Sequence, residues 1–227
     1  MTDDRMSIAR RAFVGGLGVG AAVIGAELPV GARAATAPWQ PAMDPQDAWL
    51  DMPAKHRLAF DAISANGTGD AIFFADNFIN ANKTGYKLEA SDLGVVIVVR
   101  HFATVFGYND AMWAKYGAFF SKLASFTDPK TKKVPRANLY NASGYEKLLP
   151  NHGVKLSDLH GLGVQFAVCG LATQIFSDMM AKQGLGKADE IHADLTANLV
   201  AGSHLVAAGI VAVNRTQEHG YAVAHAG

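Results

Sequence analysis

The sequence predicts an α/β domain with a largely parallel sheet, because strand-like apolar runs alternate with helix-like segments along the chain. The clearest strand covers residues 93–99, which are apolar, rich in β-branched types and without polar alternation. That composition is typical of a strand buried on both faces. A second apolar run covers 164–168 and leads directly into a helical pattern. Alternation of this kind predicts strands joined by crossover helices.

The first half of the domain is interpreted from hydrophobic spacing and turn residues. Residues 35–56 are rich in Pro, Ala and Asp, which indicates a linker or surface arm before a domain that covers 57–227. The elements expected next are a strand over 57–63, a turn over 64–69, a helix over 70–83 capped by Asp70, the strand over 93–99 and a helix over 109–123.

The second half begins with residues 126–160, which contain several Pro and Gly residues and are predicted to be an insertion. Within it we expect short helices near 143–149 and 156–162. The elements expected after it are a strand over 164–168, a helix over 172–182, a helical or irregular stretch over 187–198, a weak strand over 199–205, a helix over 206–219 and a closing strand over 221–225.

The N-terminus predicts export. Arg10 and Arg11 precede a weakly apolar, Gly- and Ala-rich run, and residues 32–34 form an Ala-Arg-Ala cleavage site. This order is typical of a twin-arginine signal over residues 1–34, which would engage the twin-arginine translocation machinery and deliver the protein to the periplasm. The alternative is a buried N-terminal helix or an uncleaved anchor, but repeated glycine makes a poor core helix.

The composition excludes several classes of partner. The chain has 20 basic and 20 acidic side chains, and removal of residues 1–34 leaves it near neutral, so no nucleic-acid binding is expected. No segment after the signal is apolar for long enough to predict a stable membrane span. The single cysteine, Cys169, excludes an internal disulfide.

Candidate site residues follow from the expected sheet, since ligands bind at the carboxyl ends of parallel strands. The first strand is followed by Asn66, the second by Arg100 and His101, and the third by Cys169; His204 is expected at the end of the fourth strand. If the sheet is parallel, these side chains share one edge. The edge would then combine a thiol, imidazoles and a guanidinium.

Cys169 stands directly before a predicted helix, and helix N-terminal amides and a nearby cation such as Arg100 both favour a thiolate. A thiolate is the nucleophilic form of cysteine. The alternative is that Cys169 packs as a small apolar side chain. Asn109 belongs to a stretch over 100–116 that is rich in aromatic and polar residues, which is either an amphipathic helix with an aromatic core face or a pocket wall with Asn109 turned toward a ligand. His101 and His204 together with the thiol would suit a metal, although no compact ligand spacing supports one.

Two motifs stand out in the C-terminal half, and their residues are Gly163-Val-Gln-Phe-Ala-Val-Cys169-Gly170 and the later Gln217, Gly220 and Tyr221. In these motifs the chain resembles the DsrE/DsrF-like family of small sulfur-relay proteins. The resemblance covers 161–225 well and 57–123 loosely, and the signal and the insertion depart from it. It implies a flavodoxin-like three-layer sandwich, a homo-oligomer and, at the position of Cys169, a cysteine that carries persulfide sulfur.

Three hypotheses about function follow. The first is an exported protein that binds or transfers sulfur through Cys169, with Arg100 or His101 stabilising the thiolate. The second is a non-catalytic periplasmic module that binds a small ligand or a metal or forms oligomers, with Cys169 as packing. The third is a redox or metal enzyme that uses His101 and His204. The residues indicate no particular cofactor.

Overall fold

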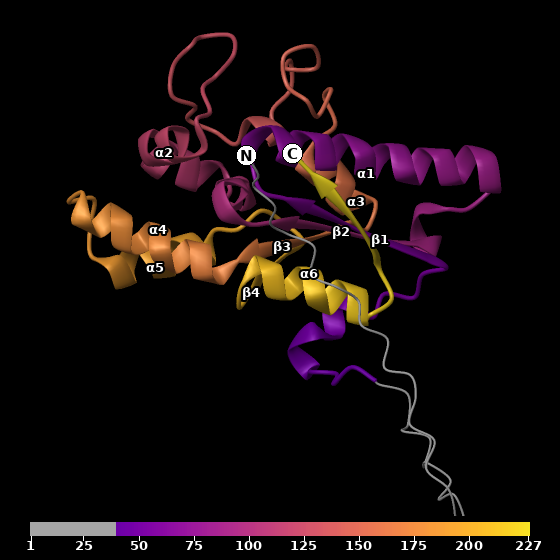
Figure 1. The fold of residues 1–227 in the computed structure, drawn as a ribbon. Helices are drawn as coiled ribbons and strands as arrows, with labels where there is room; N and C mark the ends of the chain where they lie inside the picture. Colours follow the sequence, from indigo (N-terminus) through magenta and orange to yellow (C-terminus); the bar gives the residue numbers. More distant parts are fainter. Residues whose placement is uncertain (1–39) are drawn as a thin grey trace, which may run out of the picture. The chain divides into compact units, whose positions relative to one another are not determined.

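The computed structural model describes residues 40–227, so the predicted signal over 1–34 lies outside the described residues. Five strands form one sheet in the order β4-β3-β2-β1-β5, and every pair is parallel (Figure 1). The strands are β1 (His56–Ala62), β2 (Leu93–Val99), β3 (Gln165–Cys169), β4 (Ser203–Val206) and β5 (Ala222–Ala226). The predicted α/β class with a parallel sheet is confirmed.

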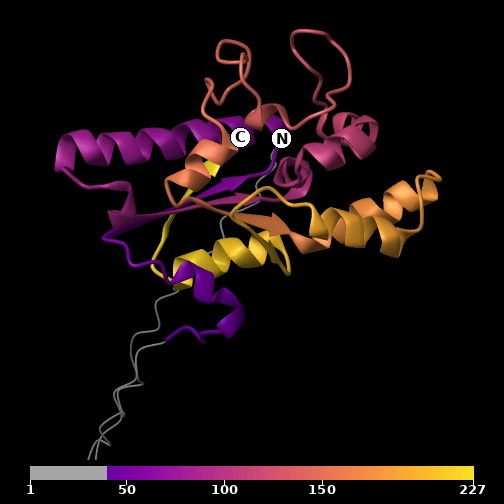
Figure 2. The same cartoon turned by 180° about the vertical axis from the view of Figure 1, so that it is seen from behind.

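Helices cover both faces of the sheet, which is compatible with a flavodoxin-like three-layer sandwich (Figures 1 and 2). The α-helices are α1 (Ala65–Tyr86), α2 (Asp110–Ala124), α3 (Leu156–Gly161), α4 (Gly170–Lys182), α5 (Ala188–Ala197) and α6 (Gly209–Glu218). Short 3-10 helices are η1 (Pro45–Leu50), η2 (Ala90–Asp92), η3 (His101–Gly107) and η4 (Leu139–Asn141). Among residues 40–227, no helix combines the length and apolar content needed to cross a membrane.

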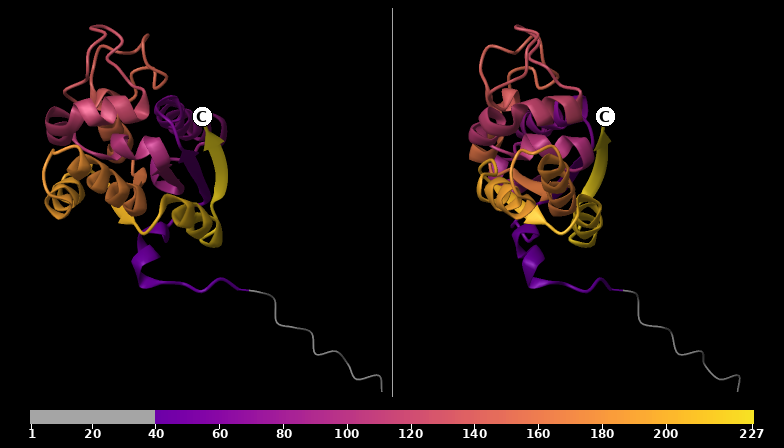
Figure 3. Two further views of the ribbon diagram at one scale, coloured as in Figure 1. Left: turned by 60° about the vertical axis from the view of Figure 1, so that its left-hand side comes forward. Right: turned by 90° about the vertical axis from the view of Figure 1, so that its left-hand side faces the viewer.

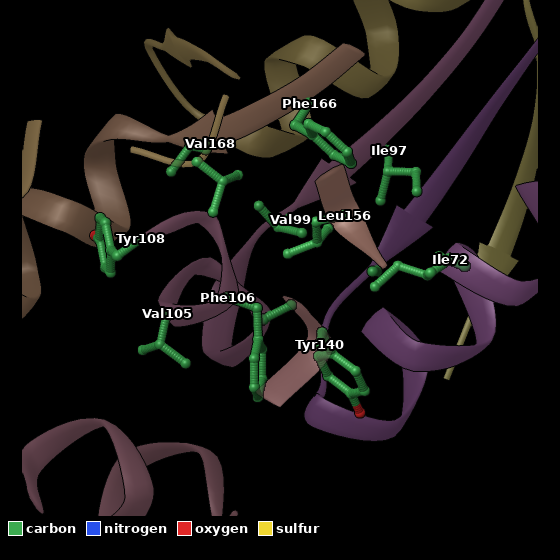
Figure 4. Close-up of a cluster of buried hydrophobic side chains, with 14 of the residues drawn as sticks. Ile72, Ile97, Val99, Val105, Phe106, Tyr108, Tyr140, Leu156, Phe166 and Val168 are labelled. Atoms are coloured by element: carbon green, nitrogen blue, oxygen red, sulfur yellow. The ribbon is translucent and has the colours of Figure 1, made fainter. Parts of the chain in front are cut away.

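The larger core lies on the face covered by α1, α2 and α3, and it forms because alternate residues of each strand point to opposite faces. Ile97 and Val99 of β2 enter this core together with Phe166 and Val168 of β3 (Figure 4). All seven residues of β2 are buried, so the unbroken apolar run seen in the sequence is explained by helices on both sides.

The smaller core lies on the opposite face, under α6 and η1 (Figure 3). It contains Val96 and Val98 of β2, Ala212 of α6 and the fully buried Leu50 of η1. The Tyr221 hydroxyl donates a hydrogen bond of 2.9 Å to the carbonyl of Leu50. The segment expected to be a linker or arm therefore contains a short helix that packs on this face of the sheet.

Most predicted elements are present, and their differences from the prediction have local causes. Helix α1 starts at Ala65, inside the predicted turn, because the Ser64 hydroxyl caps it by accepting the Gly67 amide at 3.0 Å. Gly67 has a packing role: a Cβ there would overlap the Ala226 backbone. The expected helix near 143–149 is wrong, since these residues form turns before Pro150. The other short helix of the insertion is present as α3.

Candidate functional site

The carboxyl ends of β3, β2 and β1 bring three polar side chains to one edge of the sheet. Val99 pairs with Val168 in β3 and with Ala62 in β1. Arg100 follows β2 directly, so the strand order places it between Cys169, the last residue of β3, and Asp61 of β1. We call Cys169, Arg100 and Asp61 the carboxyl-edge cluster.

Cys169 ends β3 and caps α4, with only 6 % of its surface exposed. Its Sγ accepts the Ala172 amide at 3.4 Å, while its carbonyl accepts the Thr173 hydroxyl at 2.9 Å. Gly170 is needed next because a Cβ there would lie 2.7 Å from the Val206 carbonyl oxygen. The Cys169 sulfur therefore lies at the N-terminus of α4, accepts one backbone hydrogen bond and has little contact with solvent.

Tyr108 completes the buried side of this site. Its hydroxyl lies 2.8 Å from the Thr173 hydroxyl. Burial raises the pKa of the Tyr108 phenol strongly and the nearby Cys169 raises it further, while the bond to Thr173 opposes the change. The phenol is therefore neutral at all physiological pH values and provides a polar group without charge.

Arg100 is fixed in orientation by a two-pronged ion pair with Asp61. Its Nε lies 2.6 Å from Oδ1 and its Nη2 lies 2.8 Å from Oδ2. The hydrogen bond to Asp61 raises the pKa of Arg100, burial opposes the change, and the charges of Asp61 and of the nearby Cys169 add to it. The guanidinium is thus a permanent cation at the same edge of the sheet as Cys169.

Asp61 is the member of the cluster that sequence reasoning missed, although a carboxylate inside a buried strand was a visible signal. Burial favours its neutral form, but the hydrogen bond and charge of Arg100 outweigh burial, and His225 adds a smaller effect, so the pKa of Asp61 is lowered. His225 was also missed; its Nδ1 lies 3.3 Å from Asp61 Oδ2, and 55 % of its side chain is exposed.

The structure does not bring the other predicted residues into this cluster. His101 is exposed, has a positive φ of 55° and places its ring 3.8 Å from that of Phe102. Asn66 is exposed in the first turn of α1. Asn109 caps α2 by accepting the Ala111 amide at 3.0 Å, and it lines a separate hollow of about 360 Å³.

His204 lies in the interior of β4, not at its carboxyl end as expected. Its ring stacks on Trp49 of η1 with centroids 4.3 Å apart and an interplanar angle of 10°. Burial lowers the pKa of His204, so its ring is neutral at neutral pH. It belongs to a groove on the margin of the sheet, lined by β4, η1 and α6.

Within residues 40–227, no three side chains of His, Cys, Asp or Glu are close enough together to hold a metal ion. Neither a family model, nor a curated protein, nor a solved structure matches this chain. The carboxyl-edge cluster combines a potential nucleophile with a fixed cation.

Proposed function

We propose that this chain is an exported sulfur-handling protein in which Cys169 accepts a sulfur atom and holds it as a persulfide. One observation carries the proposal: Cys169 stands at the N-terminus of α4 beside Arg100, whose guanidinium is held in place by Asp61. The resemblance of the 163–170 motif to sulfur-relay proteins supports the same residue. The predicted signal supports a periplasmic location.

The reaction needs a thiolate and a donor that carries a sulfane sulfur, such as an organic persulfide or hydropolysulfide. The Cys169 thiolate attacks the terminal sulfur of a donor R–S–SH, the donor S–S bond breaks, and a new S–S bond forms on Cys169. The products are Cys169–S–SH and the thiolate R–S⁻, so the electron pair leaves on the donor and no external oxidant is required. Arg100 favours the Cys169 thiolate before transfer, and the negative charge then leaves on R–S⁻.

The burial of Cys169 fits a carrier that works outside the cytoplasm. Only 6 % of the residue is exposed, which limits contact with bulky thiols and oxidants. A lone thiol in an oxidising compartment is otherwise open to oxidation or to pairing with another chain. Small sulfur donors would reach the Cys169 Sγ atom, whereas larger molecules would not.

The second candidate is a non-catalytic periplasmic module in which Cys169 only packs. The observation in its favour is the same burial, since Cys169 contacts the larger apolar core. Free cysteine often behaves as a small apolar residue in such positions. The two candidates differ in whether a small reagent reaches the sulfur in the native protein.

Thiol labelling separates them. The native protein is treated at neutral pH with methyl methanethiosulfonate, which is small, and in parallel with a dye-linked maleimide, which is bulky. The proposal predicts rapid labelling by the small reagent, slow labelling by the bulky one and full labelling by both after denaturation. If the native protein resists both reagents while the denatured protein labels fully, Cys169 is packing and the second candidate stands.

A further inference from the structure

The margin of the sheet at β4 has an unpaired backbone edge. Ser203 pairs with Phe166 in β3, and the Phe166 amide donates to the Gly202 carbonyl at 2.9 Å. In a parallel ladder alternate residues bond to the neighbour, so the amides and carbonyls of Ser203 and Leu205 point away from β3. Among the described residues, no loop or turn forms a backbone hydrogen bond with this outer side of β4.

A groove of about 480 Å³ runs beside this edge. Five consecutive residues, 203–207, line it, so the hollow follows the whole length of β4. One wall comes from η1 and the residues before it, and the other from α6; these walls consist of Asp44, Gln46, Asp47, Trp49, Val211, Ala212 and Arg215. Leu205 is 44 % exposed, so the edge is open to solvent. We call this feature the β4 groove.

A hydrogen bond to Gln165 fixes the tautomer of His204 in the β4 groove. Gln165 donates its Nε2 to the Gly163 carbonyl at 3.2 Å, so its Oε1 faces His204 Nε2 at 3.0 Å. His204 must therefore carry its proton on Nε2, which leaves Nδ1 as a lone-pair acceptor. The buried Ser203 hydroxyl has no hydrogen-bond partner among the described residues.

The charge of the β4 groove is acidic. Asp44 and Asp47 line it, against the single cation Arg215. That cation is already engaged, because its Nη1 lies 2.6 Å from Glu218 and its Nε lies 3.4 Å from Asp47. Asp44 accepts the Gln46 amide at 2.9 Å but has no ion-pair partner among the described residues, so a cationic occupant is favoured.

We propose that the β4 groove binds an extended, basic peptide segment of another protein, which adds to the sheet as a sixth strand beside β4. The unpaired amides and carbonyls of Ser203 and Leu205 supply the main-chain bonds, as in other cases of strand addition. Leu205 pairs with Val168 of the larger core, so its side chain lies on the face away from α6 and η1. Apolar side chains of the peptide pack beside Leu205 on that face, while the alternate basic side chains lie on the opposite face and meet Asp44 and Asp47. The proposal is independent of the chemistry at Cys169.

The probe is a fluorescein-labelled peptide of sequence Lys-Val-Lys-Val-Lys-Val, and the readout is fluorescence anisotropy with the full folded domain at low ionic strength. The acidic peptide Glu-Val-Glu-Val-Glu-Val and a copy of the basic peptide with alternate amides N-methylated are the controls. The proposal predicts that each control peptide binds at least about tenfold more weakly than the probe. Equal binding of all three peptides would overturn it.

Two variants at one position form the matched pair. Leu205→Pro removes the outward amide without removing a bond to β3, since proline is tolerated where its nitrogen faces away from the ladder. Leu205→Ala keeps the amide. We expect Leu205→Pro to lose at least about tenfold in affinity and Leu205→Ala to keep most of it. Similar losses in both variants would mean that side-chain packing, not strand addition, holds the peptide.

Val211→Lys on α6 covers the case in which Leu205→Pro fails to fold, because it places a positive charge in the β4 groove without touching β4. It should lower the affinity for the probe peptide by a similar factor and leave the circular dichroism spectrum unchanged; unchanged binding would overturn the proposal.

Sedimentation velocity tests whether a second copy of this chain occupies the β4 groove. A concentration-dependent dimer that Leu205→Pro abolishes and Leu205→Ala retains would assign the edge to self-association instead.

Discussion

The carboxyl-edge cluster and the β4 groove lie on the same sheet but differ in how their polar groups are satisfied. In the cluster, Asp61 and Arg100 pair through two bonds and Cys169 accepts an amide. At the groove, the outer edge of β4 has no backbone partner among residues 40–227. A closed, fully paired site holds a reactive group in place, whereas an open, unpaired one offers bonds to a partner. Under the two proposals, the reaction at Cys169 and the binding of a peptide take place at different parts of the sheet.

The largest effect should come from breaking the ion pair in the cluster. Asp61→Ala leaves Arg100 partly buried without its partner, so the free energy of unfolding should fall by about 3 kcal/mol, the low end for a buried pair. Urea denaturation measures this. The double variant Asp61→Ala/Arg100→Met should lose less than Asp61→Ala alone, because no unpaired charge remains. If it loses as much as the sum of the two single variants, the residues are not coupled.

The same pair makes stability depend on pH. The pKa of Asp61 is lowered in the folded state from its ordinary value of 3.8, because Arg100 outweighs burial. The folded state therefore favours the carboxylate, and the stability it contributes is present above about pH 4 and is lost as pH falls through the folded pKa. The Asp61→Asn variant should lack this part of the acid dependence.

A smaller effect should follow from crowding the cluster at Gly209. A Cβ at Gly209, the first residue of α6, would overlap the side chain of Arg100. Gly209→Ala should therefore destabilise the domain by about 2 kcal/mol, as overpacking does. Gly85→Ala is the matched control, because nothing lies within 4 Å of a Cβ at that helical position. If the two substitutions lower the free energy of unfolding equally, the missing Cβ of Gly209 is not what leaves room for the Arg100 side chain.

The smallest of these effects is expected in the β4 groove. His204→Ala removes the stack on Trp49 and should cost about 1 kcal/mol, whereas His204→Phe keeps an aromatic partner and should cost less. Burial lowers the pKa of His204 below its ordinary value of 6.5, so the stability due to its neutral ring is lost as pH falls below about 6.5. His204→Phe should remove this dependence, which thermal melts at several pH values would detect.

The sequence predicted the parts of this comparison that depend on local pattern. The unbroken apolar run of β2 and the placement of Arg100 and Cys169 at strand ends followed from spacing alone. Asp61 could not be assigned to the cluster because its partner comes from a different strand, and strand order is a tertiary property. His204 was misplaced because its strand begins only at Ser203, four residues later than the sequence pattern indicated.

The start of α1 also depends on tertiary packing that local sequence does not reveal. Ser64 and the glycines after it have the composition of a turn, yet Ser64 caps a helix and Gly67 gives room to the backbone of Ala226. That room is needed only because β5 lies beside β1. Local composition therefore predicted a turn over 64–69, whereas these residues contain the first turn of α1.

The central claim is that Cys169 accepts sulfur in the native protein, and intact-protein mass spectrometry after brief polysulfide treatment tests it most directly. We predict a gain of about 32 Da, one sulfur atom, that maps to Cys169, is absent from Cys169→Ser and is greatly reduced in Arg100→Met. If native protein gains no mass while denatured protein does, or if the Arg100→Met variant reacts as fast as the parent, the account of the carboxyl-edge cluster is contradicted.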